Sequence, residues 1–212
     1  MKRILSLTLV AIMLLSTIML TSCDALNKAK DFAHDLFGIG DDVRRTINAY
    51  EWQHLTISDN YTLNLSYEQN GISAEAVLDR TPQAEKLHIK YNTAGTKVEA
   101  DLYYDAKGGY AIEPNGSGGW VGFQSESYGE QLAPFLGELK GMRFHELVYD
   151  EDLGAYIYNL VEDGNEMNIR YYFEEGILVC IEGTAKYEGM NIIFELSNFD
   201  GVKVELPQYT KW

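Results

Sequence analysis

Catalytic or metal chemistry in this 212-residue chain would have to come from its two cysteines, four histidines and 32 acidic side chains. The histidines form no His-Glu-x-x-His motif and no paired spacing typical of a zinc site. No Gly-x-Ser-x-Gly elbow is present, and nothing in the sequence singles out two carboxylates as a glycosidase pair. The sequence therefore predicts no enzyme, no metal site and no cofactor. The four histidines are His34, His54, His88 and His145.

The most informative reactive residue is Cys23, because of what precedes it. Lys2 and Arg3 start the chain, an apolar stretch fills residues 4–20, and residues 20–23 read Leu-Thr-Ser-Cys. Charge, apolar segment and small-residue cleavage site in this order are typical of a secretory leader. A cysteine directly after the cut resembles the lipobox of bacterial lipoproteins. The resemblance implies that Cys23 is thioether-linked to diacylglycerol and becomes the acylated mature N-terminus, on the extracytoplasmic face of the cell membrane.

An uncleaved membrane anchor is the alternative interpretation of the first 22 residues. The apolar run of about 17 residues is at the lower limit for a helix that crosses a bilayer. We favour the cleaved leader because all four positions from Leu20 to Cys23 fit the lipobox pattern.

The composition of the remaining chain limits its size and its partners. Residues 23–212 have the length of one domain. Loss of Lys2 and Arg3 with the leader takes the formal net charge from −15 to −17. An acidic surface repels phosphate backbones, which excludes DNA and RNA as partners. If Cys23 is acylated, Cys180 is left without a disulfide partner, and its apolar surroundings predict a small buried side chain.

Hydrophobic periodicity separates a short helical region from a long strand-rich region. Apolar residues recur at helical spacing over residues 24–38, and a second helical segment is expected over residues 41–52 with Asp41 or Asp42 as its cap. From His54 onward the apolar period is two, which is typical of strands with one dry face. Short Gly-containing connections between these strands predict antiparallel pairing.

One amphipathic helix is expected inside the strand-rich region. Ser127 and Glu130 have the spacing of a capping box, an apolar stripe follows, and Gly141 ends the segment. Pro134 is expected to kink or divide this helix.

These elements predict an α+β, mostly β fold. About ten antiparallel strands would form one curved sheet, a half-barrel, because a sheet of this width tends to curl. The inserted helix and the N-terminal helix would cover its hollow. We expect a leader over residues 1–22, an anchor and helical segment over residues 23–50, and a single β-rich domain over residues 51–212.

Two sequence patterns suggest relatives. Glu51-Trp52 before Asn60-Tyr61-Thr62 resembles uncharacterised lipoproteins of Firmicutes. The strand-rich body with its inserted helix and the Val-Glu-Leu-Pro at residues 204–207 is more distantly similar to LolA/LppX-like lipoprotein carriers. The second resemblance implies a half-barrel that holds acyl chains between a curved sheet and its covering helices.

Two functions therefore remain open. The first is binding or carriage of a lipid or another hydrophobic molecule in the hollow of the sheet. The second is a non-catalytic structural or protein-interaction lipoprotein of the cell envelope, with a filled core and an acidic outer face. The apolar residues expected to line the hollow under the first hypothesis are Leu63, Leu65, Leu102, Tyr104, Trp120, Phe135, Leu136, Tyr158, Tyr171 and Phe194.

Overall fold

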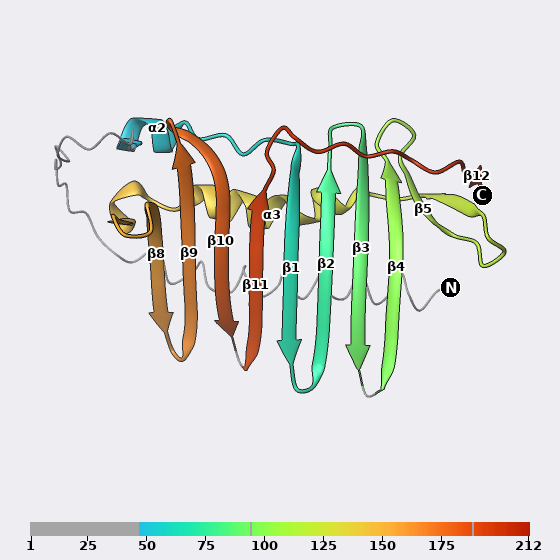
Figure 1. Ribbon diagram of the computed structural model, residues 1–212, viewed down its shortest axis with the longest axis horizontal. Coiled ribbons are helices and arrows are strands. Elements are labelled where there is room, and N and C mark those ends of the chain that lie inside the picture. The colour runs from blue at the N-terminus through green and yellow to red at the C-terminus, as the bar shows by residue number, and fades with distance from the viewer. Residues whose placement is uncertain (1–46, 94, 188) are drawn as a thin grey trace.

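One wide sheet and one helix lying across it form the body of the protein (Figure 1). The computed structural model describes residues 47–93, 95–187 and 189–212. Within these residues twelve strands form a single sheet. The strands are β1 (Tyr61–Gln69), β2 (Ile72–Arg80), β3 (Ala84–Thr93), β4 (Thr96–Asp105), β5 (Tyr110–Pro114), β6 (Trp120–Gln124), β7 (Val148–Asp150), β8 (Ala155–Glu162), β9 (Asn165–Glu174), β10 (Ile177–Tyr187), β11 (Met190–Ser197) and β12 (Thr210–Lys211).

The sheet consists of two antiparallel meanders joined in the middle. Its order is β12-β6-β5-β4-β3-β2-β1-β11-β10-β9-β8-β7. The first meander, β1 to β6, and the second, β7 to β11, meet where β1 pairs with β11. Tight hairpins connect most neighbours: Asn70 and Gly71 both have positive φ, as do Asp163 and Gly164. Two successive positive φ values are typical of type I′ turns, which confirms the antiparallel pairing predicted from the short connections.

The inserted helix α3 (Tyr128–Gly141) follows β6 and begins and ends where the sequence predicts. Ser127 accepts a hydrogen bond from the backbone of Glu130, whose own side chain bonds back to Ser127. This reciprocal pair is the capping box expected from the spacing. The helix continues through Pro134 without being divided, which leaves a kink as the remaining form of that prediction. Met142 is the C-terminal cap.

The core lies between α3 and one face of the sheet. Register places Leu63 opposite Leu78 on β2 and opposite Leu196 on β11, and all three side chains are buried. Because side chains alternate along a strand, every second residue of the long strands projects toward α3 and the intervening residues project away. The alternation identified in the sequence is thus confirmed as the separation between a dry face and a wetter one.

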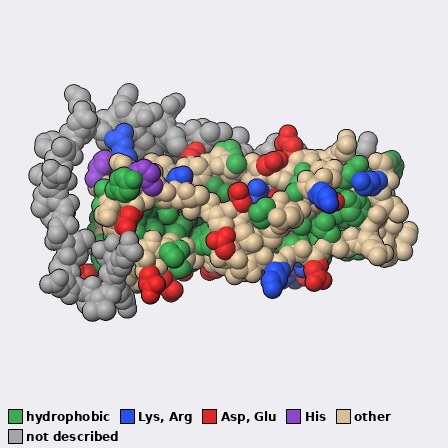
Figure 2. Space-filling model, turned by 90° about the horizontal axis from the view of Figure 1, so that it is seen from above, with side chains coloured by type: hydrophobic (Ala, Val, Ile, Leu, Met, Phe, Trp, Pro, Cys, Tyr) green, Lys and Arg blue, Asp and Glu red, His purple; other side chains and the backbone are tan. Residues whose placement is uncertain are grey.

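The sheet is wider and less curled than predicted. It has twelve strands instead of about ten, and seen from above the body is a straight slab with charged side chains interspersed along it (Figure 2). Closure into a barrel would require the edge strands to approach each other, but β7 and β12 terminate opposite sides of the sheet. These edges are short, at three and two residues, and β12 pairs parallel with β6. The expectation of a strongly curved half-barrel is therefore corrected to an open sheet.

The helical region before β1 also differs from its prediction. Helix α2 (Ala49–Gln53) is capped by Asn48, whose side chain accepts from the Glu51 N–H. The start of the segment expected over residues 41–52, with Asp41 and Asp42, lies outside the described residues. A short 3-10 helix, η1 (Phe144–Glu146), replaces the start of an expected strand after α3. The leader, Cys23 and the helix expected over residues 24–38 lie outside the described residues.

Tight packing under α3 leads to a first prediction, at Gly183 on β10. A Cβ atom added to Gly183 would lie 2.1 Å from Cζ of Phe194, whose ring packs edge-on against Phe135 of α3. We expect Gly183→Ala to lower the free energy of unfolding by about 1–3 kcal/mol, because the ring must leave its place in the core.

Gly137→Ala is the matched control for this substitution. Gly137 is exposed on α3 and a Cβ added there would meet no atom within 4 Å. Its replacement should raise the free energy of unfolding by about 0.5–1 kcal/mol, as expected for Gly to Ala inside a helix. Urea unfolding followed by circular dichroism measures both, and an unchanged Gly183→Ala protein would contradict the packing described here.

Candidate functional site

The space between α3 and the sheet is filled by the protein's own side chains. Of the ten residues predicted to line a hydrophobic site, seven are buried within one apolar cluster: Leu63, Leu102, Tyr104, Phe135, Tyr158, Tyr171 and Phe194. Leu65 and Leu136 are half-buried against the same cluster. The structure thus brings nine of the ten together, as packing partners of one another.

Trp120 is the exception among the predicted residues. Register and alternation place it on the face away from α3, where its ring packs edge-on against Tyr103 with centroids 5.2 Å apart. It belongs to a small aromatic group near β12 in which Tyr209 donates a hydrogen bond to Asp105. Trp120 therefore does not contribute to the cluster beneath α3.

A buried carboxylate fixes the first turn of α3 to the sheet. Glu85 on β3 is only 3% exposed, and it accepts hydrogen bonds from the backbone N–H groups of Tyr128 (2.7 Å) and Gly129 (3.2 Å). The guanidinium of Arg80 lies 2.8 Å from the same carboxylate. Free N–H groups at the start of a helix favour a negative charge, so Glu85 is a stabilising partner supplied by the sheet. Gly129 is required here because a Cβ would collide with Arg80.

The far end of α3 is held by hydrogen bonds to its last carbonyl groups. Tyr171 on β9 donates its hydroxyl to the carbonyl of Leu139 at 2.8 Å. Trp52 of α2 donates Nε1–H to the carbonyl of Met142 at 2.5 Å. Both aromatic rings are buried and contact each other edge-on. Helix α3 is therefore fastened at both ends as well as along its apolar face.

The role of Glu85 was missed by the sequence interpretation, although the sequence contains a signal for it. Glu85 is in phase with Leu87 and Ile89 on β3, and Arg80 is in phase with Leu78 on β2. Two opposite charges on adjacent strands, both in phase with buried residues, indicate a paired internal charge.

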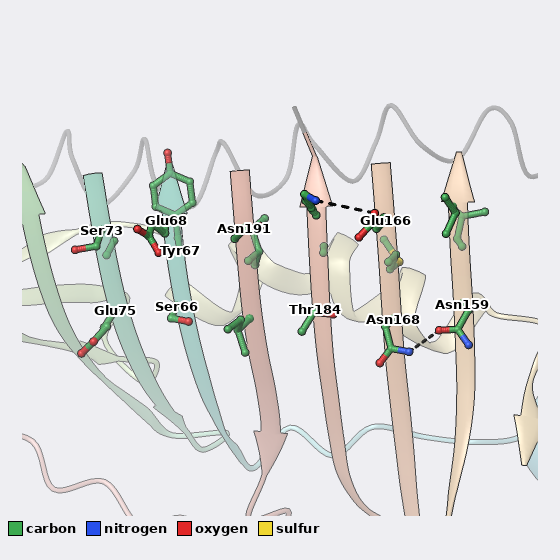
Figure 3. Close-up of a pocket in the computed structure, with 18 residues that line it drawn as sticks. Ser66, Tyr67, Glu68, Ser73, Glu75, Asn159, Glu166, Asn168, Thr184 and Asn191 are labelled. Carbon is green, nitrogen blue, oxygen red and sulfur yellow. Dashed lines mark hydrogen bonds and ion pairs between the residues drawn. The ribbon is translucent and has the colours of Figure 1, made fainter. Parts of the chain in front are cut away.

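A hollow of about 590 Å³ lies at the end of the strands where the β1–β2, β8–β9 and β10–β11 hairpins are (Figure 3). Three consecutive residues from each of six neighbouring strands line it, which makes three cross-strand rows. The middle row projects to the same face as α3 and is apolar, whereas the two flanking rows project away from α3. The middle row is Ala74, Tyr67, Ile192, Ala185, Met167 and Leu160.

Other reactive side chains do not assemble into a catalytic group. Cys180 is half-buried, so the prediction of a buried side chain was wrong. Partial burial, with Glu195 and Glu182 nearby, raises the pKa of its thiol to about 12, which disfavours the reactive thiolate. His88 bonds Asp101 at 2.7 Å on the face away from α3. Within the described residues no group of three or more His, Cys, Asp or Glu side chains is arranged to hold a metal ion.

Comparisons with known proteins add no relationship to these observations. No protein-family model matches the chain, and no curated protein matches it significantly. In the part of the chain that the structure describes, neither helix has the length and apolar character needed to cross a bilayer.

Replacement of Glu85 provides the second prediction. We expect Glu85→Ala to lower the free energy of unfolding by about 3 kcal/mol, because it leaves Arg80 and two helix N–H groups without their partner. Glu85→Gln keeps an acceptor and should cost less. Urea unfolding at neutral pH measures both changes, and equal costs for the two variants would contradict the capping role.

The pKa of Glu85 provides the third prediction. Burial raises this pKa above its ordinary value of 4.5, an effect that outweighs the lowering by Arg80 and the backbone N–H groups. The folded state therefore binds the proton more tightly than the unfolded state does. Stability from this carboxyl is fully present below pH 4.5 and is lost as the pH rises through the raised pKa.

Glu85→Gln is the reference for this measurement because its amide does not titrate. The free energy of unfolding of the wild-type protein minus that of Glu85→Gln should fall as the pH rises from 4.5 toward neutrality. A difference that grows with pH would show that Arg80 and the helix N-terminus lower this pKa.

Proposed function

We propose that this chain is a non-catalytic, membrane-anchored lipoprotein of the cell envelope that acts through protein interaction. Its acylated Cys23 would hold the β-rich body at the extracytoplasmic face of the membrane. The leader sequence before Cys23 supports the location. The packed interior and the absence of an assembled reactive group among the described residues support an interaction role over catalysis.

The observation that carries this proposal is the attachment of α3. A helix that covers a ligand cavity must move away or leave space beneath it. Here Glu85 binds the first turn, Tyr171 and Trp52 bind the last carbonyl groups, and aromatic side chains occupy the interior. Separation of α3 from the sheet would expose buried apolar surface and leave buried polar groups without partners, and both changes cost free energy.

Carriage of a lipid or another hydrophobic molecule is the second candidate, and the hollow at the hairpin end favours it. Its volume of about 590 Å³ is in the range of small-molecule sites. This site is distinct from the residues beneath α3 that the sequence suggested. The half-barrel carrier architecture would be relevant here only if the sheet curled further around a bound molecule.

Acylation of Cys23 is tested by the fourth prediction. Cys23→Ala should release the protein from the membrane fraction of a bacterial host, because two acyl chains are needed for stable anchoring and none can then be attached. Fractionation with immunoblotting measures the release, and mass spectrometry of the wild-type N-terminus should show the diacylglycerol adduct. An unmodified Cys23 or an intact leader would rule out the anchor.

Native mass spectrometry of the detergent-extracted protein separates the two candidate functions. Under the interaction proposal, the protein should carry no lipid beyond its covalent acyl chains, and a fluorescent fatty acid should not bind. Thr184→Phe would fill the hollow from an exposed position that lines it, and it serves as the control if binding is observed. A copurified lipid that Thr184→Phe displaces would instead establish carriage.

A further inference from the structure

The sheet face opposite α3 carries a surface that the core does not use. Over β1, β2 and β8–β11, the side chains of alternate rows project away from the helix. A smaller hollow of about 360 Å³ shares Asn168, Thr184 and Ile193 with the larger one. We call this area the acidic face and define it by its carboxylates and by the apolar residue among them: Glu68, Glu75, Glu166, Glu182, Glu195 and Ile193.

The acidic face has an excess of negative charge. Its two hollows are lined by five carboxylates but by only two basic side chains, Arg170 and Lys186. Lys186 lies 4.0 Å from Glu166, and Lys90 of β3 is opposite Glu75 at the border. The positive charges within the surface therefore offset less than half of its carboxylates, and an approaching cation would be attracted.

A pair of like charges lies at the centre of this excess. Glu182 on β10 is directly opposite Glu195 on β11. Like charges at directly opposed positions destabilise a sheet. Hydroxyl and amide groups bind these carboxylates: Tyr172 donates to Glu182 at 2.9 Å, and Ser197 donates to Glu195 at 2.8 Å. Glu182 is also directly opposite Arg170 on β9, which compensates part of its charge. Glu195 has no basic residue directly opposite it, since its register partners are Asn64 on β1 and Glu182 on β10.

The neighbouring half of the same face does not show this excess. On β3 and β4, Lys86 lies 3.6 Å from Asp101, and His88 bonds the same carboxylate. Basic and acidic side chains alternate across these two strands, so their charges are compensated locally. The negative excess is therefore a property of one half of the face.

Ile193 provides an apolar contact point within the acidic face. It is 56% exposed, and its cross-strand neighbours are Ser66 on β1 and Thr184 on β10. These neighbours are small and polar, so the Ile193 side chain stands clear of them. An apolar residue surrounded by a charged rim is the arrangement found at protein interfaces.

We infer that the acidic face docks an extended segment of a partner protein that presents basic and apolar side chains on one of its sides. The basic side chains would lie against Glu195 and its neighbours, and an apolar side chain two residues away would pack on Ile193. This spacing fits because side chains on one side of an extended segment repeat every second residue, as Ile193 and Glu195 do on β11. This inference rests on the proposed interaction function and adds to it the surface and the chemistry of the partner.

Binding of a defined peptide to the full, detergent-extracted protein tests this inference. The probe is a fluorescein-labelled octapeptide with lysine and leucine in turn at every second position and serine between them, and the same peptide with glutamate in place of lysine is the probe control. Fluorescence anisotropy should show binding of the basic peptide only, with an affinity that falls as salt increases from about 0.05 M to about 0.5 M.

Glu182→Gln/Glu195→Gln is the decisive variant, and Glu99→Gln/Asp101→Asn is its matched control. Both remove two carboxylates from the same sheet face, but only the first removes them from the acidic face. We expect the first to weaken binding by about tenfold, as two exposed ion pairs would, and the control to change it less than twofold. Thermal unfolding verifies folding of the first variant, in which Glu182 loses its charge opposite both Glu195 and Arg170.

Ile193→Ser tests the apolar contact and should weaken binding by about threefold at either salt concentration, the effect of one small apolar contact. Equal losses in the two charge variants would show attraction to overall charge only and would overturn the inference, as would an absence of binding at low salt. Neither result affects the anchoring and lipid measurements, which do not involve Glu182 or Glu195. A failure of this surface is therefore distinguishable from a failure of the proposed function.

Discussion

The carboxylate of Glu85, buried beneath the first turn of α3, is the contact on which the architecture of the body depends. In the part of the chain that the structure describes, α3 covers the middle of a twelve-stranded sheet, and its position across the strands decides which side chains form the core. Glu85 fixes one end over β3, and Tyr171 fixes the other end over β9. Between these points the apolar stripe of α3 packs on β1 and β11, where the two meanders meet.

Local features of the fold could be predicted from the sequence because local interactions determine them. Alternating apolar residues identified the long strands, and Asn-Gly and Asp-Gly turns identified their hairpins. Ser127, Glu130 and Gly141 marked the limits of α3. The pairing of β1 with β11 and the parallel addition of β12 involve residues far apart in the chain, and no turn or period encodes such contacts. The degree of curl was overestimated because width permits curling, whereas edge pairing is what closes a sheet.

The candidate site was predicted only as a set of side chains that share one face. Nine of the ten chosen residues do cluster, since apolar residues in phase on neighbouring strands must meet. Whether such a cluster surrounds a space or fills it depends on the volumes of the side chains between α3 and the sheet. The ring of Phe194, for example, occupies the space over Gly183. A sequence period contains no information on that volume. The acidic face was equally hidden, because the opposition of Glu182 and Glu195 depends on the register of β10 against β11.

The borders of the sheet have a consequence for the membrane-anchored protein that we propose. Acylation would restrict the molecules to two dimensions, where collisions between neighbouring copies are frequent and similarly oriented. A long open edge strand would then recruit the next copy through backbone hydrogen bonds and begin a growing ribbon. β7 and β12 are too short to offer many donors and acceptors, but they do not form the whole border. Among the described residues, β5 pairs only with Tyr103–Asp105 of β4, which leaves the backbone of residues 96–102 without an outer strand. This stretch contains Lys97, Glu99 and Asp101, and charged side chains along an open edge oppose the addition of another copy.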